Sequence, residues 1–300
     1  MAHGLRYRSK QRDGCAGPGL YYSVDWANAG HIGLQTDFKM LSRLRVSRLW
    51  ACVLYLNNGF SVWLRVRFKR PLPPFYFRNG MVWHHGKHDE PILLLREIYI
   101  ENFYEPLNAP PDATVLDIGA NIGAITMFWA HKRPDIHFHA YEPNPQAYES
   151  LRQNITFNAL SERVTTHPEA IGGKRGRLDL WTDVPTVLST AYGEAPKAGG
   201  KKLSVPMITL DDAWDRIGRA PIWMLKIDVE GAEGDILEAT SDELLANVNT
   251  ACVEWHDNIV PGVRIRCIER LREAGFRVRE RVHPWDQGIL FMDRVSQDTN

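Results

Sequence analysis

The sequence predicts an α/β fold whose mostly parallel β-sheet is covered by helices on both faces and includes an antiparallel strand at its C-terminal end. After Pro110 and Pro111, short apolar runs alternate with segments whose apolar residues have helical spacing. This alternation is typical of a parallel sheet buried between helices. The first run leads directly into a glycine-rich turn at residues 119–123. The last two runs are joined by only a few residues, which favours an antiparallel pair.

The individual elements follow from local patterns. Alternating apolar residues predict a strand at 61–68, and helical spacing predicts a helix at 91–104 that begins at Pro91. Further strands are predicted at 114–118, 137–141, 163–167, 177–181, 204–208, 222–229 and 249–255, with a closing antiparallel pair at 276–282 and 288–295. Helices are predicted at 122–131, 145–158 and 263–274, the last ending at Gly275.

The 300 residues exceed one small domain. We expect an irregular N-terminal arm at 1–45, an extension with its own strand and helix at 46–111, and one α/β domain at 112–300. The first 45 residues show no sustained apolar period and are interrupted by glycines and a proline.

The charges limit the class of partner. Thirty-six basic residues balance thirty-six acidic ones, so the sequence lacks the excess of positive charge that favours nucleic acid. We therefore expect a small-molecule or glycan acceptor and no nucleic acid. Two local clusters of basic residues still need an interpretation. They form either a solvated arm, which we favour, or a contact to phosphate or a lipid surface. They are Arg6, Arg8, Lys10 and Arg12, followed by Arg43, Arg45 and Arg48.

The four cysteines lack the spacing of a zinc site or a disulfide framework, which indicates a reducing compartment. The longest apolar candidate for a membrane span, residues 49–56, is too short to cross a bilayer. No apolar core of signal-peptide type follows the first basic residues. We therefore expect a soluble, cytoplasmic protein, and the sequence does not predict its oligomeric state.

The turn after the first strand of the domain predicts a nucleoside site. Glycines there allow the backbone to turn tightly and approach a ligand at a helix N-terminus. A nicotinamide-binding loop would also carry glycine at its third and sixth positions, where this chain has Asn121 and Ala124. Asp117, at the end of the strand, supplies the negative charge that suits a sulfonium amino acid. The loop residues expected to contact the ligand are Gly119, Ala120, Asn121 and Gly123.

Two later positions extend this site. Glu142 ends the next strand about 25 residues after Asp117, where a carboxylate can accept hydrogen bonds from both ribose hydroxyls. Ala170 follows the third strand, in a loop that either lies beside the adenine or serves only as a turn. Together these features favour S-adenosylmethionine over a dinucleotide.

A cluster of acidic residues predicts the place of the chemistry. Three carboxylates follow the buried strand that begins at residue 222, and parallel sheets place their sites at such strand ends. The candidate bases are Asp228, Glu230, Glu254 and His256. Asp228 and Glu254 end neighbouring strands and should face one crevice. Asp228 then either holds the amino group of the donor, which we prefer, or joins Glu254 in binding a divalent metal ion.

These motifs together resemble the FkbM family of methyltransferases over about residues 90–260. The matching segments are 96–99 and Tyr104, 115–123, Tyr141-Glu142-Pro143, Thr209-Leu210-Asp211-Asp212 and, most specifically, Lys226-Ile227-Asp228-Val229-Glu230-Gly231-Ala232-Glu233. The resemblance implies a Rossmann-like class I methyltransferase fold with a seven-stranded sheet. It also implies O-methylation of a sugar, polyketide or other secondary metabolite with S-adenosylmethionine as donor. The resemblance does not identify the acceptor, and it does not extend to the residues before about position 60.

Three rival functions remain. A nucleic-acid methyltransferase is disfavoured because the strand end at Asp228 lacks the Asn/Asp-Pro-Pro-aromatic sequence used for amino groups of bases. An inactive protein that retains the fold is disfavoured by the presence of Asp117, Asn121, Glu142 and Asp228. A nicotinamide oxidoreductase is disfavoured by the glycine spacing.

Overall fold

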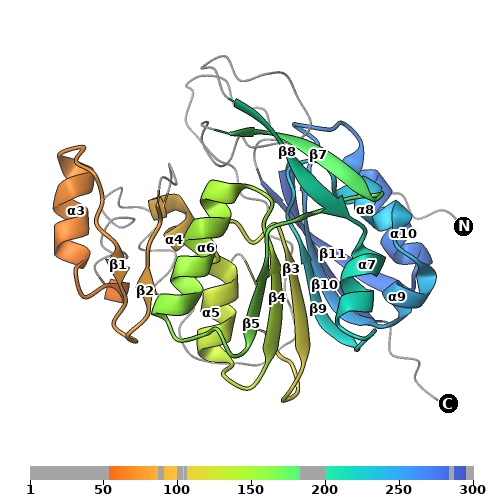
Figure 1. Cartoon of the computed structure of the whole chain (residues 1–300), viewed down its shortest axis with the longest axis horizontal. Helices are drawn as coiled ribbons and strands as arrows, with labels where there is room; N and C mark the ends of the chain where they lie inside the picture. Colours follow the sequence, from red (N-terminus) through yellow and green to blue (C-terminus); the bar gives the residue numbers. More distant parts are fainter. Residues whose placement is uncertain are drawn as a thin grey trace, which may run out of the picture.

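A seven-stranded β-sheet forms the centre of the computed structural model (Figure 1), which describes residues 54–86, 91–99, 104, 107–182, 201–283 and 287–294. Its strands are β3 (Thr114–Ile118), β4 (His137–Tyr141), β5 (Val164–His167), β9 (Ile222–Ile227), β10 (Val248–His256), β11 (Phe276–His283) and β12 (Gln287–Arg294). Their spatial order is β11-β12-β10-β9-β3-β4-β5. The predicted arm at residues 1–45 lies outside the described residues.

The strand order positions the site. Neighbours from β5 to β10 pair in parallel, and β12 alone runs antiparallel to both strands beside it. The chain builds β3, β4 and β5 outward in one direction and then returns to place β9 on the other side of β3. This reversal is the switch point at which open α/β sheets bind ligands, beyond the carboxyl ends of the strands. The predicted Rossmann-like class I fold is confirmed.

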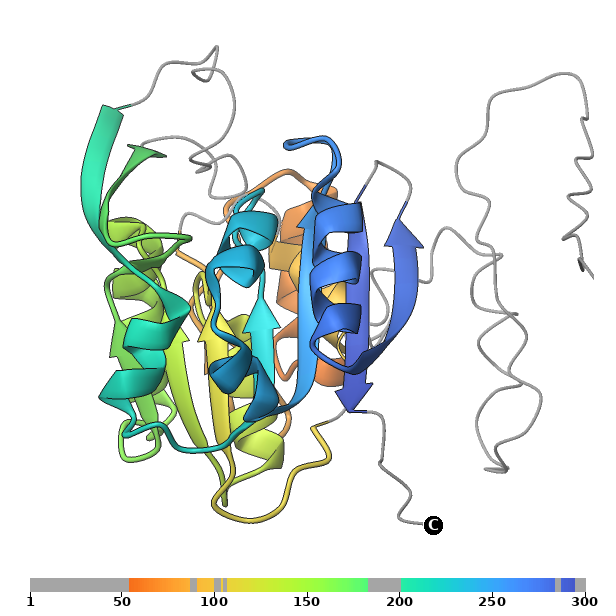
Figure 2. The ribbon, with the colours of Figure 1, turned by 90° about the vertical axis from the view of Figure 1, so that its right-hand side faces the viewer.

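Helices cover both faces of the sheet (Figures 1 and 2). One face carries α4 (Pro91–Tyr99), α5 (Ala124–Lys132) and α6 (Pro145–Phe157), and the other carries α7 (Leu210–Arg216), α8 (Glu233–Ala239), α9 (Asp242–Ala246) and α10 (Val263–Glu273). The alternating side chains of β3 enter both cores, since Val115 packs toward α5 whereas Leu116 packs toward α10. Among the described helices, none is long and apolar enough to cross a membrane.

Local sequence explains where these helices begin. Asn144 precedes α6, and its side-chain oxygen accepts a hydrogen bond from the backbone N–H of Gln146 at 2.9 Å, while Pro145 occupies the first helical position. Thr209 and Asp212 form a reciprocal capping box at the start of α7.

The strand predicted at 61–68 is wrong, because these residues form most of helix α3 (Gly59–Arg67). Apolar residues at every second position also stand four apart, so an alternating run satisfies helical spacing on two faces. In α3, Val62 is buried and Val66 packs against the core, whereas Phe60 is 65% exposed. The predicted helix at 91–104 is confirmed only as far as Tyr99, and the residue at 104 lies in a bend.

The strands predicted near 177–181 and 204–208 exist but do not belong to the main sheet. They are β7 (Gly176–Thr182) and β8 (Lys201–Ile208), which pair antiparallel with each other. With β6 (Ala170–Ile171) they form a three-stranded sheet beyond the carboxyl ends of the main strands. The first four residues of β8 are exposed, which a central parallel strand would not allow. A third, two-stranded sheet contains β1 (Phe75–Tyr76) and β2 (Val82–Trp83).

A buried ion pair connects β3 to β9 at the switch point. The Lys226 ammonium lies 3.0 Å from an Asp117 carboxylate oxygen, and the two side chains are 2% and 0% exposed. The other Asp117 oxygen accepts a hydrogen bond from the Thr126 hydroxyl on α5 at 2.5 Å. Because a buried charge is costly without its partner, this pair constrains both strand ends.

We expect Lys226→Met to lower the free energy of unfolding by about 3 to 5 kcal/mol, because it leaves the Asp117 carboxylate buried without its counter-ion. The measurement is urea unfolding followed by circular dichroism. The matched control is Lys202→Met, which breaks an exposed ion pair with Asp179 and should cost less than about 1 kcal/mol. Equal losses in the two variants would contradict this account.

Candidate functional site

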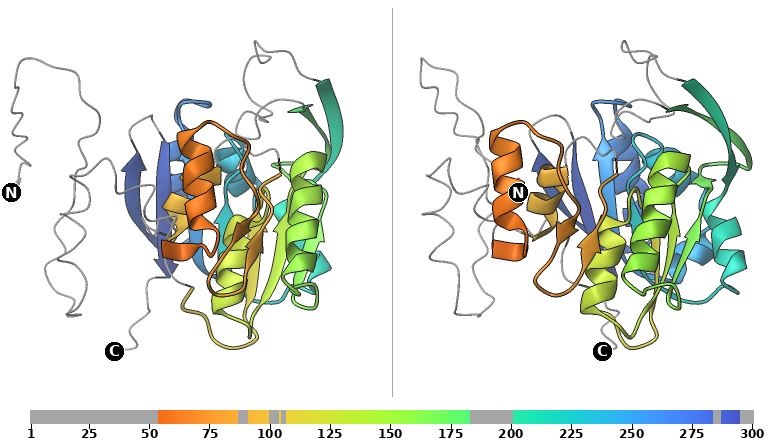
Figure 3. Two further views of the ribbon diagram at one scale, coloured as in Figure 1. Left: turned by 90° about the vertical axis from the view of Figure 1, so that its left-hand side faces the viewer. Right: turned by 60° about the vertical axis from the view of Figure 1, so that its left-hand side comes forward.

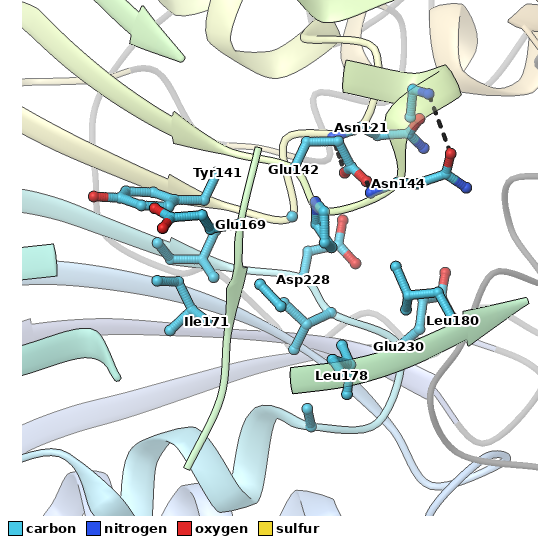
Figure 4. A pocket seen from close by; sticks show the side chains of 17 residues that line it. Asn121, Tyr141, Glu142, Asn144, Glu169, Ile171, Leu178, Leu180, Asp228 and Glu230 are labelled. Atoms are coloured by element: carbon cyan, nitrogen blue, oxygen red, sulfur yellow. Dashed lines mark hydrogen bonds between the residues drawn. The ribbon is translucent and has the colours of Figure 1, made fainter. Parts of the chain in front are cut away.

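A pocket lies at the switch point, beyond the carboxyl ends of β3, β4 and β9 (Figure 4). Its lining comes from the loops after these strands and from the small sheet of β6 and β7. The residues include Gly119, Asn121, Tyr141, Glu142, Asn144, Glu169, Ala170, Ile171, Leu178, Leu180, Asp228 and Glu230. The lining is therefore mixed, with carboxylate and amide side chains from the strand-end loops and apolar side chains from the small sheet.

In the glycine loop at residues 119–123, both glycines occupy positions that a larger residue could not take. Gly119 has φ of 80°, and a Cβ at this position would lie 1.7 Å from the carbonyl oxygen of Asp228. Gly123 has φ of 85°, and its added Cβ would lie 2.5 Å from a methyl group of Leu151. Larger residues would thus clash and also adopt a left-handed conformation that favours glycine. Glycine at 119 therefore lets the loop pass directly beside the end of β9, and glycine at 123 lets it pack against α6.

Glu142 ties this loop to the start of α6. One carboxylate oxygen accepts a hydrogen bond from the Asn121 backbone N–H at 2.8 Å, and the other accepts one from the Asn144 backbone N–H at 2.8 Å. Burial raises the pKa of Glu142 to about 7, although these two hydrogen bonds and Lys226 act in the opposite direction. Each carboxylate oxygen keeps lone-pair capacity for a further donor, such as a ligand hydroxyl.

Asn121 points to a ligand at this end of the pocket. Its backbone is left-handed, with φ of 52°. Its side-chain oxygen is buried and has no hydrogen-bond partner among the described residues. Buried polar atoms are normally paired, so this acceptor fits a donor group on a bound molecule.

Apolar side chains line two sides of the pocket. Ala170 and Ile171 on β6 are buried, and Leu180 on β7 lies across the pocket from Tyr141 and Ile171 (Figure 4). Glu169, on the side of Tyr141, forms an ion pair with the Arg216 guanidinium.

Beside the pocket, His256 lies among several carboxylates. Its Nδ1 donates a hydrogen bond to a Glu233 oxygen at 2.7 Å, and the Glu233 side chain is fully buried. Its Nε2 lies 3.5 Å from a Glu230 oxygen and 3.9 Å from a Glu254 oxygen. Glu230 takes a left-handed backbone conformation, with φ of 56°, in the turn after β9. The predicted bases therefore do lie close together.

Burial and mutual charge shift the acid–base properties of this group. Burial alone would lower the pKa of His256, but the hydrogen bond to Glu233 and the charges of Glu230, Glu233 and Glu254 raise it to about 10. Burial and the charge of Asp228 raise the pKa of Glu254 to about 8. Burial also raises the pKa of Glu230 to about 7. At neutral pH, the imidazole is thus the cation, whereas the carboxyl groups of Glu230 and Glu254 lose their protons close to neutrality.

Tyr104 connects Asp228 with Glu254. Its buried hydroxyl donates to a Glu254 oxygen at 3.0 Å and lies 3.5 Å from an Asp228 oxygen. Burial and the negative charges of Glu254 and Asp228 raise the pKa of Tyr104 well above its usual value, so the hydroxyl keeps its proton. The Lys226 ammonium lies 3.4 Å from the same Asp228 oxygen.

A divalent cation has one candidate place among the described residues. Asp228, Glu254 and His256 offer ligand atoms within 4.8 Å of one another. Lys226 and Tyr104 already satisfy the two carboxylates, and His256 is held as a cation by Glu233. A metal ion at this place would have to compete with these contacts, and our preference for Asp228 as a contact of the donor over a metal ligand stays a prediction.

His84, His85 and His88 stand beside Gly86, Lys87 and Asp89, a polar sequence that predicts a solvated loop rather than a metal site. The structure differs, because His85 is buried and its Nε2 bonds to the Pro73 carbonyl at 3.0 Å. His84 stacks on Phe157 with ring centroids 4.6 Å apart. His88 lies outside the described residues.

The predicted ligand residues divide into two groups. Gly119, Asn121, Glu142, Ala170 and Asp228 line the pocket, whereas Asp117, Ala120 and Gly123 are buried and do not belong to its lining. Of the predicted bases, Asp228 and Glu230 line the pocket, and Glu254 and His256 lie beside it.

Several contributors were not predicted. Thr126, Tyr104 and the two leucines of β7 join the site through contacts between elements distant in sequence. Two of these residues carried a signal, since Glu233 closes the segment that begins at Lys226 and Tyr104 belongs to the segments that resemble the family.

Comparison with known proteins places the fold in a family. Residues 117–278 match the family described as the methyltransferase FkbM domain. The chain is 27% identical over 221 residues to methyltransferase sdnD of Sordaria araneosa, covering 64% of this chain and 84% of that protein. It is 28% identical over 233 residues to 31-O-demethyl-FK506 methyltransferase FkbM of Streptomyces tacrolimicus, covering 67% and 87%. The crystal structure of methyltransferase FkbM from Methylobacillus flagellatus KT aligns over 85% of this chain and 60% of that one, with 13% identity and a TM-score of 0.42.

We expect NMR titration to give a pKa near 10 for His256 in the wild-type chain. In Glu233→Gln this pKa should fall by about 1 to 3 units, because the variant removes the adjacent negative charge. Glu238→Gln is the matched control, since Glu238 lies on the same helix but pairs with Arg266. A wild-type value near 6.5 would contradict the proposed charge state.

Proposed function

Because the chain belongs to the methyltransferase FkbM domain family, we propose that it transfers a methyl group from S-adenosylmethionine to a hydroxyl oxygen of a sugar, polysaccharide or secondary metabolite. The observation that carries the proposal is the pocket at the switch point. The buried Glu142 carboxylate can accept hydrogen bonds from ribose hydroxyls, and a cluster of titratable groups lies beside the pocket. That the acceptor atom is oxygen is supported by one relative, whose name refers to 31-O-demethyl-FK506.

The lining of the pocket favours one orientation of S-adenosylmethionine. Its ribose hydroxyls would donate to Glu142, and its adenine would lie among the apolar side chains of β6 and β7. Its methionine part would then extend along Gly119 toward Asp228, whose side chain is 25% exposed. This orientation brings the sulfonium methyl to the edge of the acidic cluster.

We assign Glu254 as the general base. The acceptor oxygen attacks the methyl carbon, the carbon–sulfur bond breaks, and S-adenosylhomocysteine leaves as a neutral thioether. The hydroxyl proton passes to the Glu254 carboxylate, whose raised pKa of about 8 matches that task. His256 is already protonated and therefore serves as the nearby cation that keeps part of the Glu254 population ionised.

Donor binding tests the role of Glu142. We expect Glu142→Ala to raise the Kd for S-adenosylhomocysteine about 10- to 100-fold in calorimetric titration, because two hydrogen bonds to the ribose are lost. The control is Glu149→Ala, which removes an exposed carboxylate of α6 that pairs with Arg152 and should leave the Kd within about threefold. NAD, titrated in parallel, should not bind. An unchanged Kd in Glu142→Ala would exclude the ribose contact.

Turnover tests the role of Glu254. We expect Glu254→Gln to lower kcat by about 10²- to 10⁴-fold while the Kd for S-adenosylhomocysteine stays within about threefold, because the variant removes the proton acceptor and not a donor contact. Wild-type kcat should rise with pH as the Glu254 carboxyl loses its proton near pH 8, and it should level off above that pH. Full activity is expected in EDTA. A pH limb near 8 that persists in Glu254→Gln would assign the base elsewhere.

A further inference from the structure

The N-terminal part of the chain is strongly basic although the whole chain is neutral. Residues 38–88 contain no aspartate or glutamate and ten lysines and arginines. The remainder therefore carries an equal excess of acidic residues, since the totals balance. Within the described residues 54–86, the basic side chains are Arg65, Arg67, Lys69, Arg70 and Arg78.

The same segment exposes unusually many large apolar side chains. Nine such side chains are exposed among the described residues, and five of them lie in 54–86. They are Leu54 at 69%, Tyr55 at 40%, Phe60 at 65%, Phe68 at 64% and Tyr76 at 44%. Single exposed apolar residues need no explanation, but a local concentration marks an interaction surface.

Helix α3 and the residue that follows it carry two of these side chains, Phe60 and Phe68, beside basic residues. Its inner face buries Gly59 and Val62, while Phe60 stacks on Trp63 with ring centroids 5.9 Å apart. The Arg67 guanidinium lies 5.9 Å from the ring centre of Phe68. Figure 3 shows α3 at the edge of the molecule, away from the central sheet. Aromatic side chains interleaved with arginines and without any acid are typical of helices that lie in a lipid interface.

We propose that α3 and the adjoining residues 68–70, the basic aromatic face, dock this enzyme on the surface of an anionic lipid bilayer. The rings of Phe60 and Phe68 enter the headgroup region, and Arg67, Lys69 and Arg70 contact lipid phosphates. Two copies of this chain would bring like charges together if they met through this face, so the face suits an anionic partner better than itself. The proposal does not depend on which acceptor is methylated.

The test is co-sedimentation of the full chain with vesicles of phosphatidylcholine, either pure or mixed with phosphatidylglycerol. We expect at least about tenfold stronger binding to the anionic vesicles, weakening as salt is raised, because several basic side chains contribute. Phe60→Ser/Phe68→Ser should weaken binding at least about tenfold, and Arg67→Glu/Lys69→Glu should abolish the preference for anionic lipid. Arg65 is not substituted in these variants, because its guanidinium donates a hydrogen bond to the Pro71 carbonyl.

The matched control is Ile265→Ser/Val282→Ser, which removes exposed apolar side chains, 47% and 63% exposed, from α10 and β11. This variant should bind vesicles like the wild-type chain, and all variants should unfold at similar temperatures. Absence of wild-type binding to anionic vesicles would overturn the proposal, as would equal loss in the control. Light scattering that shows a dimer dissociated by Phe60→Ser/Phe68→Ser would assign the face to a second copy, and tighter binding to a nucleic-acid duplex would assign it to nucleic acid.

Discussion

The site depends on one buried cation. The Lys226 ammonium contacts an Asp117 oxygen at 3.0 Å, the Gly119 carbonyl at 3.2 Å and an Asp228 oxygen at 3.4 Å. It therefore joins the two strands that flank the switch point, the glycine loop and the acidic cluster. Burial would lower the pKa of Lys226, but the charges of Asp117 and Asp228 outweigh this effect and raise it. The ammonium stays charged in an almost dry environment because these acids surround it.

Around this cation, the residues that we propose for donor binding lie apart from those that we propose for proton transfer. Glu142 and Asn121 stand on the side of the glycine loop, whereas Glu254 and His256 belong to β10 on the far side of Lys226 and Asp228. Glu233 holds His256 from behind, and its carboxylate also accepts the Gly231 backbone N–H at 3.0 Å. One acidic segment thus supplies both the turn that closes β9 and the partner that keeps the imidazole charged.

Charge is distributed unevenly over the molecule. The basic residues before position 88 are offset by acidic residues in the rest of the chain, so the neutral total hides two regions of opposite sign. The balanced composition speaks against a chain-wide nucleic-acid surface, but it says nothing about a local patch. The aromatic and arginine side chains of α3 lie together only because its inner valines pack on the core.

The sequence by itself determined most strands after residue 110, the helices α5, α6 and α10, the glycine loop and the carboxylates at the strand ends, because these features are set by local spacing and by backbone needs. It did not predict α7, α8, α9 or β6. Tertiary structure decided the rest. It turned the alternating segment at 59–67 into a helix and moved β7 and β8 out of the main sheet to close the pocket. It also brought Tyr104 to Glu254, 150 positions away in sequence, and Glu233 to His256. Charge states followed from these contacts, since burial and neighbouring charges act through space and leave no trace in local sequence.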